Sequence, residues 1–164
     1  MIFIIGGSYQ GKTECALKRL RSQAGLENGQ AGGKPAIFDA RKIEELKSLE
    51  RLTNGQGEQA LRARRRLFQE IEGSHGVLHL ELLIKRLMEQ EPAAENWEEE
   101  LFSALQDRNG TEKIITADEI GYGIVPLDPF ERAYREREGR FCQRVAACAG
   151  QVLRVVCGVE TRIK

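Results

Sequence analysis

Apolar residues lie along the chain in short runs that alternate with longer segments of helical periodicity. Each run has the length of one buried strand, and together the runs cover residues 2–5, 36–38, 77–80, 114–117 and 152–156. The segments with helical spacing cover about residues 12–20, 41–71, 82–88, 97–105 and 130–149. Two neighbouring parallel strands must be joined by a crossover connection, which is usually a helix. The alternation of strands with helices therefore predicts an α/β domain with a mostly parallel sheet flanked by helices.

Turn residues divide some of these segments further. The sequence Asn-Gly-Gln-Gly at 54–57 interrupts the segment 41–71, so we expect two helices there rather than one. The run at 77–80 has two interpretations, because a strand followed by a helix at 82–88 and a single buried helix fit these residues almost equally well. Glycine and other turn residues predict three loops, at residues 27–33, 109–110 and 121–129.

The composition fits one compact domain over residues 1–164. The chain has 164 residues, 41% of them hydrophobic, and 25 basic residues balance 25 acidic ones. We therefore expect no charge-driven binding to nucleic acid or to a membrane, although opposite charges can gather locally. The chain opens without a basic leader and has no apolar run of about 20 residues, so we expect a cytoplasmic enzyme. The four cysteines lack metal-ligand spacing and are expected to be reduced thiols: Cys15, Cys142, Cys148 and Cys157.

A complete phosphate-binding motif lies between the first predicted strand and the helix after it. Its residues match Gly-x-x-x-x-Gly-Lys-Ser/Thr and are Gly6, Gly7, Ser8, Tyr9, Gln10, Gly11, Lys12 and Thr13. Glycine lets backbone N–H groups turn inward, and the amino terminus of the helix adds positive partial charge. We expect this loop to bind ATP or GTP with Mg²⁺, with Lys12 bridging the terminal phosphates and the Thr13 hydroxyl ligating the metal.

Phosphoryl transfer also needs acids that serve the metal and the attacking hydroxyl. Asp118 and Glu119 follow a predicted buried strand, whose carboxyl end lies at the edge of a parallel sheet that carries the phosphate loop. Asp118 and Glu119 are the first candidates for the catalytic acids, and Lys12 is the third candidate catalytic residue. Asp39 and Glu81 are alternatives, since each also ends a predicted strand, and Glu81 with Thr13 is a candidate metal pair.

Two segments resemble the bifunctional adenosylcobinamide kinase and adenosylcobinamide-phosphate guanylyltransferase family. Residues 118–126 read Asp-Glu-Ile-Gly-Tyr-Gly-Ile-Val-Pro, close to the family's Asn-Glu-Val-Gly-x-Gly-Ile-Val-Pro motif. The family's Arg-x-Phe-Arg-Asp-x-x-Gly-Arg-x-Asn-Gln helix is matched by Arg132, Tyr134, Arg135, Glu136, Gly139, Arg140 and Gln143. The phosphate loop at 6–13 is similar as well. The resemblance is specific over residues 1–20 and 114–164.

The resemblance implies a P-loop fold, often assembled as a homotrimer, that acts late in cobalamin biosynthesis. Its partners would be nucleotides and corrinoid small molecules. The kinase step of the family phosphorylates the aminopropanol hydroxyl of adenosylcobinamide, and the transferase step passes GMP from GTP through a covalent histidine. The leading hypothesis is therefore a nucleotide-dependent adenosylcobinamide kinase. The rival hypothesis is a diverged nucleotide-binding module without corrinoid chemistry.

The chain departs from the family where the second activity would need a histidine. Residues 36–74, where the resemblance places the covalent histidine, contain none. His75 lies in a Gly-Ser-His-Gly turn and His79 in the 77–80 run, and we interpret them as turn or packing residues, with a covalent role as the minority alternative. We therefore expect that this chain does not form the covalent GMP-histidine intermediate, or forms it only poorly. Three further departures are Asp118 for asparagine, Cys142 for the second asparagine and Glu160 for a proline; Glu81 is the nearest counterpart of the family's mid-strand acid.

Overall fold

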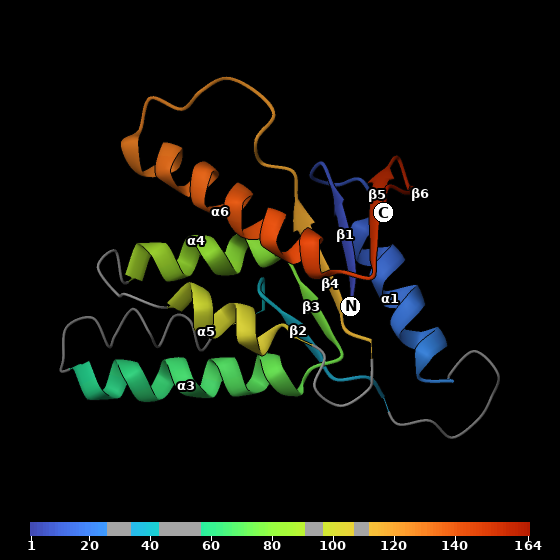
Figure 1. Ribbon diagram of the computed structural model, residues 1–164, viewed down its shortest axis with the longest axis horizontal. Helices are drawn as coiled ribbons and strands as arrows, with labels where there is room; N and C mark the ends of the chain where they lie inside the picture. The colour runs from blue at the N-terminus through green and yellow to red at the C-terminus, as the bar shows by residue number, and fades with distance from the viewer. Residues whose placement is uncertain (26–33, 43–56, 91–96, 107–111) are drawn as a thin grey trace.

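The computed structural model describes residues 1–25, 34–42, 57–90, 97–106 and 112–164 (Figure 1). Within these residues a six-stranded sheet forms the centre, in the order β2-β3-β4-β1-β5-β6. The strands are β1 (Ile2–Gly6), β2 (Ile37–Asp39), β3 (Gly76–Leu78), β4 (Ile114–Asp118), β5 (Gln151–Val156) and β6 (Val159–Arg162). Among these strands, every neighbouring pair is parallel except β5 and β6. The predicted α/β fold with a mostly parallel sheet is confirmed.

Helices cover both faces of this sheet. On one face lies α1 (Lys12–Gln23), which buries Cys15, Ala16 and Leu20 as its apolar spacing predicts. The other face carries α3 (Gly57–Gly73), α4 (Leu80–Gln90), α5 (Trp97–Ala104) and α6 (Pro129–Cys148) (Figure 1). Each face has its own hydrophobic core, and the larger one joins the four helices to β1, β3 and β4. The predicted loops at 27–33 and 109–110 and the break at 54–57 lie mostly or wholly outside the described residues.

The third strand is shorter than its apolar run predicts. β3 ends at Leu78, and α4 already begins at Leu80, so the strand-then-helix interpretation of this segment is confirmed with an earlier boundary. Between the two elements His79 has a φ of 63°, in the left-handed region that ends an extended strand. Its backbone N–H donates to Thr116 Oγ1 on the neighbouring β4 at 2.9 Å. His79 is therefore a junction residue between β3 and α4 rather than a residue within a strand.

The sixth strand was not predicted. β6 pairs antiparallel with β5 as a hairpin, and its four residues are mostly exposed. Strand prediction from apolar runs misses such an element, because Val-Glu-Thr-Arg buries little apolar surface. The signal present in the sequence was the two-residue connection Cys157-Gly158, which adopts positive φ at both positions, as a tight hairpin turn requires.

A buried lysine joins the ends of two helices beneath the sheet. Lys113 Nζ donates to the carbonyl oxygens of Ile71 at 2.7 Å, Glu72 at 3.2 Å and Ala104 at 2.9 Å. These carbonyls belong to the last turns of α3 and α5, where no N–H group four residues further along the same helix remains to donate to them; Ile71 O also accepts from Ser74. The cation also lies at the negative ends of both helix dipoles. Lys113 thereby fixes α3 and α5 against the start of β4.

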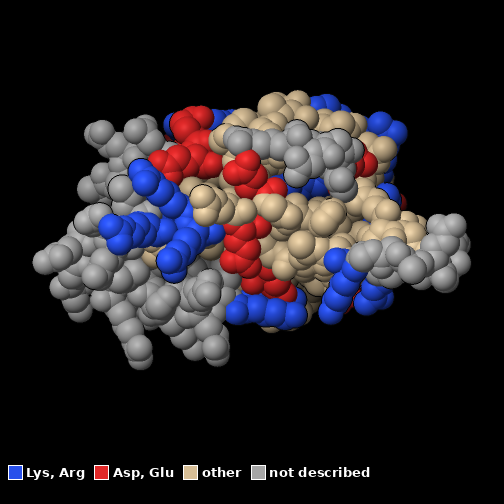
Figure 2. Space-filling view, turned by 90° about the horizontal axis from the view of Figure 1, so that it is seen from below, with Lys and Arg blue, Asp and Glu red and all other residues tan. Residues whose placement is uncertain are grey.

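Opposite charges segregate locally although the chain has no net charge. Acidic side chains run across the middle of the face seen from below, with basic groups to either side (Figure 2). On α3, Arg62, Arg65 and Arg66 are exposed. All four cysteines lie in described segments and are free thiols, as expected. Among the described residues, no helix combines the length and the apolar character needed to span a bilayer.

Candidate phosphate-binding and catalytic site

The phosphate loop connects β1 to α1 at the carboxyl edge of the parallel strands, where the motif predicts it. Gly6 and Gly11 both need to be glycine here. A Cβ on Gly6 would lie 2.4 Å from the carbonyl oxygen of Val155, and Gly11 has a φ of 91° as the residue that caps α1. The loop is braced by the β5–β6 turn, since Gln10 accepts hydrogen bonds from the backbone N–H groups of Cys157 at 2.6 Å and Gly158 at 2.9 Å. The unpredicted hairpin therefore helps to shape the loop.

Lys12 and Asp118 connect the loop to the end of β4. Asp118 lies opposite Gly6 in the parallel pairing of β1 with β4. Lys12 Nζ lies 2.6 Å from Asp118 Oδ1 and donates to the carbonyl oxygen of Gly7 at 2.7 Å, and Ser8 Oγ donates to Asp118 Oδ2. The lysine is only 4% exposed. The structure thus places the predicted phosphate-binding cation and the first candidate acid in direct contact.

His79 faces the same loop, which sequence reasoning did not anticipate. Its Nε2 lies 3.1 Å from Thr13 Oγ1, and its Nδ1 lies 3.2 Å from Glu81 Oε1. The other carboxylate oxygen of Glu81 accepts the backbone N–H of Asp118 at 3.1 Å. Glu81 is almost fully buried, and its position in the first turn of α4 brings it beneath the ends of β3 and β4. The apolar run at 77–80 does not signal this position, because it does not show that β3 ends at Leu78, one residue before His79.

Of the other predicted acids, Glu119 and Asp39 are held by arginines. Glu119 Oε2 pairs with Arg154 Nη2 at 3.0 Å, on the β5 side of the loop. Asp39 pairs with Arg41 at 3.0 Å, and although burial alone raises the pKa of this carboxyl, the hydrogen bonds from Arg41 hold it below its usual value. A catalytic role for Glu119 stays a prediction, but its side chain points to Arg154 rather than to Lys12.

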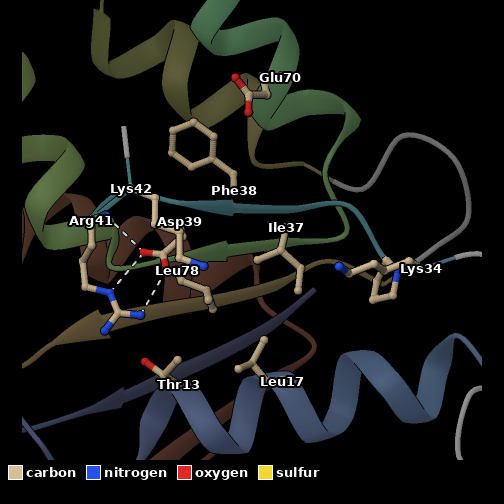
Figure 3. Close-up of a pocket in the computed structure, with 11 residues that line it drawn as sticks. Thr13, Leu17, Lys34, Ile37, Phe38, Asp39, Arg41, Lys42, Glu70 and Leu78 are labelled. Carbon is tan, nitrogen blue, oxygen red and sulfur yellow. Dashed lines mark hydrogen bonds and ion pairs between the residues drawn. The ribbon is translucent and has the colours of Figure 1, made fainter. Parts of the chain in front are cut away.

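Two adjoining hollows surround these residues. The phosphate-loop cleft, of about 540 Å³, is lined by residues 8–14 with Arg41, His79, Glu81, Leu82 and Asp118. The lateral groove, of about 630 Å³, is lined by Thr13, Leu17, Pro35, Ile37, Phe38, Leu78, Glu70, Asp39 and three cationic residues, Lys34, Arg41 and Lys42 (Figure 3). Thr13 and Arg41 line both hollows. A ligand in the groove therefore lies directly beside one in the cleft.

His75 takes no part in this site. It precedes β3, and its Nδ1 accepts the backbone N–H of Ala36 at 3.1 Å. Its interpretation as a turn residue is consistent with this position at the opposite end of β3 from His79. Trp97 is buried against Phe141, with ring centroids 6.4 Å apart, whereas Tyr122 is largely exposed beside Arg154.

Behind the cleft, α6 carries a buried acid, Glu138, and a partly buried thiol, Cys142. Cys142 Sγ donates to Glu138 Oε1 at 2.9 Å, and both side chains lie against the side of the sheet that holds Glu81. Burial is the main cause that raises the pKa of Glu138 from its ordinary 4.5 to about 7; the hydrogen bond from Cys142 opposes this rise, and the negative charges of Glu81 and Asp118 contribute to it. Burial also raises the pKa of the Cys142 thiol.

This raised pKa predicts a pH-dependent stability. Between pH 4.5 and about 7 the folded protein keeps a proton on Glu138 that the unfolded chain releases. The contribution of this group to stability is therefore full below pH 4.5 and is lost as the pH rises through about 7. Glu138→Gln, which stays neutral, is expected to stabilise the protein at pH 8 by up to about 3 kcal/mol and to have little effect at pH 4.5. Denaturant unfolding at the two pH values measures this, with the exposed Glu136→Gln on the same helix as the control. Equal effects of both variants at pH 8 would contradict it.

Comparison with known proteins agrees with this architecture. The family model described as cobinamide kinase / cobinamide phosphate guanyltransferase matches residues 54–163. Two curated relatives are bifunctional adenosylcobalamin biosynthesis proteins, one from Salmonella typhimurium (41% identical) and one from Escherichia coli (39% identical), each over 51 residues. These alignments cover 31% of this chain and 28% of each relative. The phosphate loop at 6–13 lies outside the family match and is separate evidence. The chain belongs to the cobinamide kinase / cobinamide phosphate guanyltransferase family.

Proposed function

We propose that this protein transfers the terminal phosphoryl group of ATP or GTP to a hydroxyl of adenosylcobinamide, in cobalamin biosynthesis. The observation that carries the proposal is the buried Lys12 of a complete phosphate loop, 2.6 Å from the carboxylate of Asp118 in one cleft. A P-loop lysine serves the terminal phosphates of a bound nucleotide, and the carboxylate beside it can receive the proton of the attacking hydroxyl. Family membership supports the corrinoid as the acceptor.

The residues of the cleft fit a nucleotide with a divalent cation. Backbone N–H groups of residues 6–13 and the amino terminus of α1 provide the phosphate cradle. The Thr13 hydroxyl and the carboxylates of Asp118 and Glu81 are hard oxygen donors that suit Mg²⁺. When bound, the cation neutralises charge on the transferring phosphoryl group. Lys12 pairs with Asp118, and nucleotide binding is proposed to exchange this ion pair for one between Lys12 and phosphate.

The acceptor is proposed to enter from the lateral groove. This groove is amphipathic, since Leu17, Ile37 and Leu78 lie opposite the charged Arg41 and Lys42 (Figure 3). Because Thr13 lines both hollows, we propose that an acceptor hydroxyl in the groove meets the terminal phosphate in the cleft at this residue. The hydroxyl oxygen attacks the terminal phosphorus as the bond to the bridging oxygen breaks, and positioning supplies most of the acceleration.

Several attributes of the whole protein belong to the same proposal. We propose that the chain works as a single cytoplasmic domain, assembles as a homotrimer, and binds neither nucleic acid nor a membrane. Guanylyl transfer is not proposed, because residues 36–74 lack a histidine. His79 lies in the cleft, but at the end of β3 rather than on a helix after β2.

One incubation separates the kinase from the binding module. The protein is mixed with adenosylcobinamide and either γ-labelled ATP or γ-labelled GTP, and label in adenosylcobinamide phosphate is measured by chromatography. Transfer of label supports the kinase. A protein that binds both nucleotides by calorimetry but transfers nothing from either is the nucleotide-binding module. A parallel incubation with α-labelled GTP, quenched at alkaline pH, reports any covalent GMP, which we do not expect.

A further inference from the structure

The cleft holds a donor set that differs from an all-oxygen magnesium site. His79, Glu81 and Asp118 each offer one ligand atom, and these three atoms lie within 4.8 Å of one another. Ligands around one ion at about 2.1 Å lie up to about 4.2 Å apart, so small side-chain adjustments bring His79 and Asp118 onto a single cation, with Glu81 beside them. Two of these side chains are half-buried and Glu81 is buried, which limits competition from water. The three come from the ends of two adjacent parallel strands and the first turn of α4.

The imidazole of His79 is held with one nitrogen available toward the phosphate loop. Its backbone is fixed by the hydrogen bond to Thr116, and its Nδ1 lies 3.2 Å from Glu81 Oε1. Glu81 is a carboxylate that can only accept, so in the neutral ring Nδ1 donates and the lone pair of Nε2 faces Thr13 Oγ1 at 3.1 Å. A carboxylate that orients the second ring nitrogen is the arrangement found behind most metal-bound histidines. Thr13 is the residue whose hydroxyl serves the metal in a phosphate loop.

We propose that this cleft binds a divalent transition-metal ion, such as Mn²⁺ or Co²⁺, through His79 and Asp118, and prefers it to Mg²⁺. The affinity of a site with a nitrogen ligand rises from Mn²⁺ to Co²⁺, and imidazole suits such transition metals, whereas Mg²⁺ takes oxygen ligands and keeps much of its water. The site shares the cleft with the proposed kinase reaction, but its test needs neither nucleotide nor acceptor. Failure of the metal preference and failure of the kinase are therefore separate results.

Lys12 gives the proposal a second consequence. Its ammonium lies 2.6 Å from Asp118 Oδ1 in the ligand-free protein, so a metal ion at Asp118 competes with it. Removing this cation lowers the electrostatic cost of metal binding. Lys12→Ala is therefore expected to bind the metal ion more tightly than the unmodified protein when no nucleotide is present, by about tenfold. A metal ion bound elsewhere on the surface would not respond to this change.

The experiment is a metal titration of the full chain without nucleotide. Co²⁺ binding is followed by its visible absorption, and Mn²⁺ and Mg²⁺ binding by calorimetry. We expect Mn²⁺ and Co²⁺ to bind at least about tenfold tighter than Mg²⁺. His79→Asn, whose side chain tolerates the left-handed backbone, is expected to weaken Co²⁺ binding by about tenfold or more and to change its spectrum, while Mg²⁺ affinity stays within about twofold. Thermal melting verifies that the variant is folded.

His75→Asn is the matched control, because His75 lies at the other end of β3 and binds a backbone N–H instead. It is expected to leave all three metal affinities unchanged. The proposal is overturned by equal affinities for Mg²⁺ and Mn²⁺, by a Co²⁺ spectrum that survives His79→Asn, or by the absence of Co²⁺ binding to the folded unmodified protein. A loss of binding in both histidine variants would also overturn it.

Discussion

Lys12→Ala is expected to lower phosphoryl transfer by at least about a hundredfold and to weaken binding of metal-bound ATP or GTP. The ammonium of Lys12 is buried in the phosphate-loop cleft, where it has little solvent to screen it. Such a fixed cation stabilises the charge that develops on the transferring phosphoryl group. In other enzymes, removal of one hydrogen-bond donor that stabilises a developing negative charge lowers kcat by about a hundredfold to a thousandfold. Turnover with adenosylcobinamide and nucleotide affinity by calorimetry measure the two effects.

Lys18→Ala is the matched control, because Lys18 lies on the same helix and is exposed. It is expected to change neither turnover nor nucleotide affinity beyond about twofold. Lys12→Ala also leaves Asp118 without its cation, so unfolding of both variants is compared at the assay temperature. Unchanged nucleotide affinity in a folded Lys12→Ala protein would remove the basis for assigning the cleft to phosphate.

Much of the fold and the phosphate loop was predictable because local signals agreed with the global arrangement. The run at 2–5, the glycines at 6–7 and the helix from Lys12 each indicate the same strand-loop-helix unit. The parallel pairing that sets Asp118 opposite Gly6 then follows from the requirement that crossovers place strand ends at one edge. The contact of Asp118 with Lys12 is a direct result of this topology.

The role of His79 could not be predicted, because it depends on where a strand ends. The apolar run at 77–80 is equally consistent with two positions of His79. The residue can lie inside the strand with its side chain on one face of the sheet, or it can follow the last residue of the strand. A left-handed backbone at His79 decides between them, and propensity gives no warning of it at a single position. The same applies to β6, whose exposed residues carry no apolar pattern and whose turn nevertheless braces Gln10.

Asp118→Asn and Glu119→Gln are expected to differ strongly, although the two acids are adjacent in sequence and were both predicted to be catalytic. Alternation along the end of β4 sends their side chains to different partners, Asp118 to Lys12 and Glu119 to Arg154. Asp118→Asn removes a charge that can accept the proton of the attacking hydroxyl and that is proposed to hold the cation, so we expect turnover to fall by about a hundredfold to a thousandfold and metal-bound nucleotide to bind more weakly.

Glu119→Gln loses only the half-exposed pair with Arg154, for which we expect a change in turnover below about threefold. Each side chain keeps its shape as an amide, so the pair of variants compares charge at two positions of one strand end. Steady-state rates at saturating nucleotide and acceptor, with the melting temperature of each variant, provide the measurement. A fall in turnover of equal size in both variants would contradict this expectation. It would mean that the Glu119 carboxylate contacts the reacting atoms in the transition state.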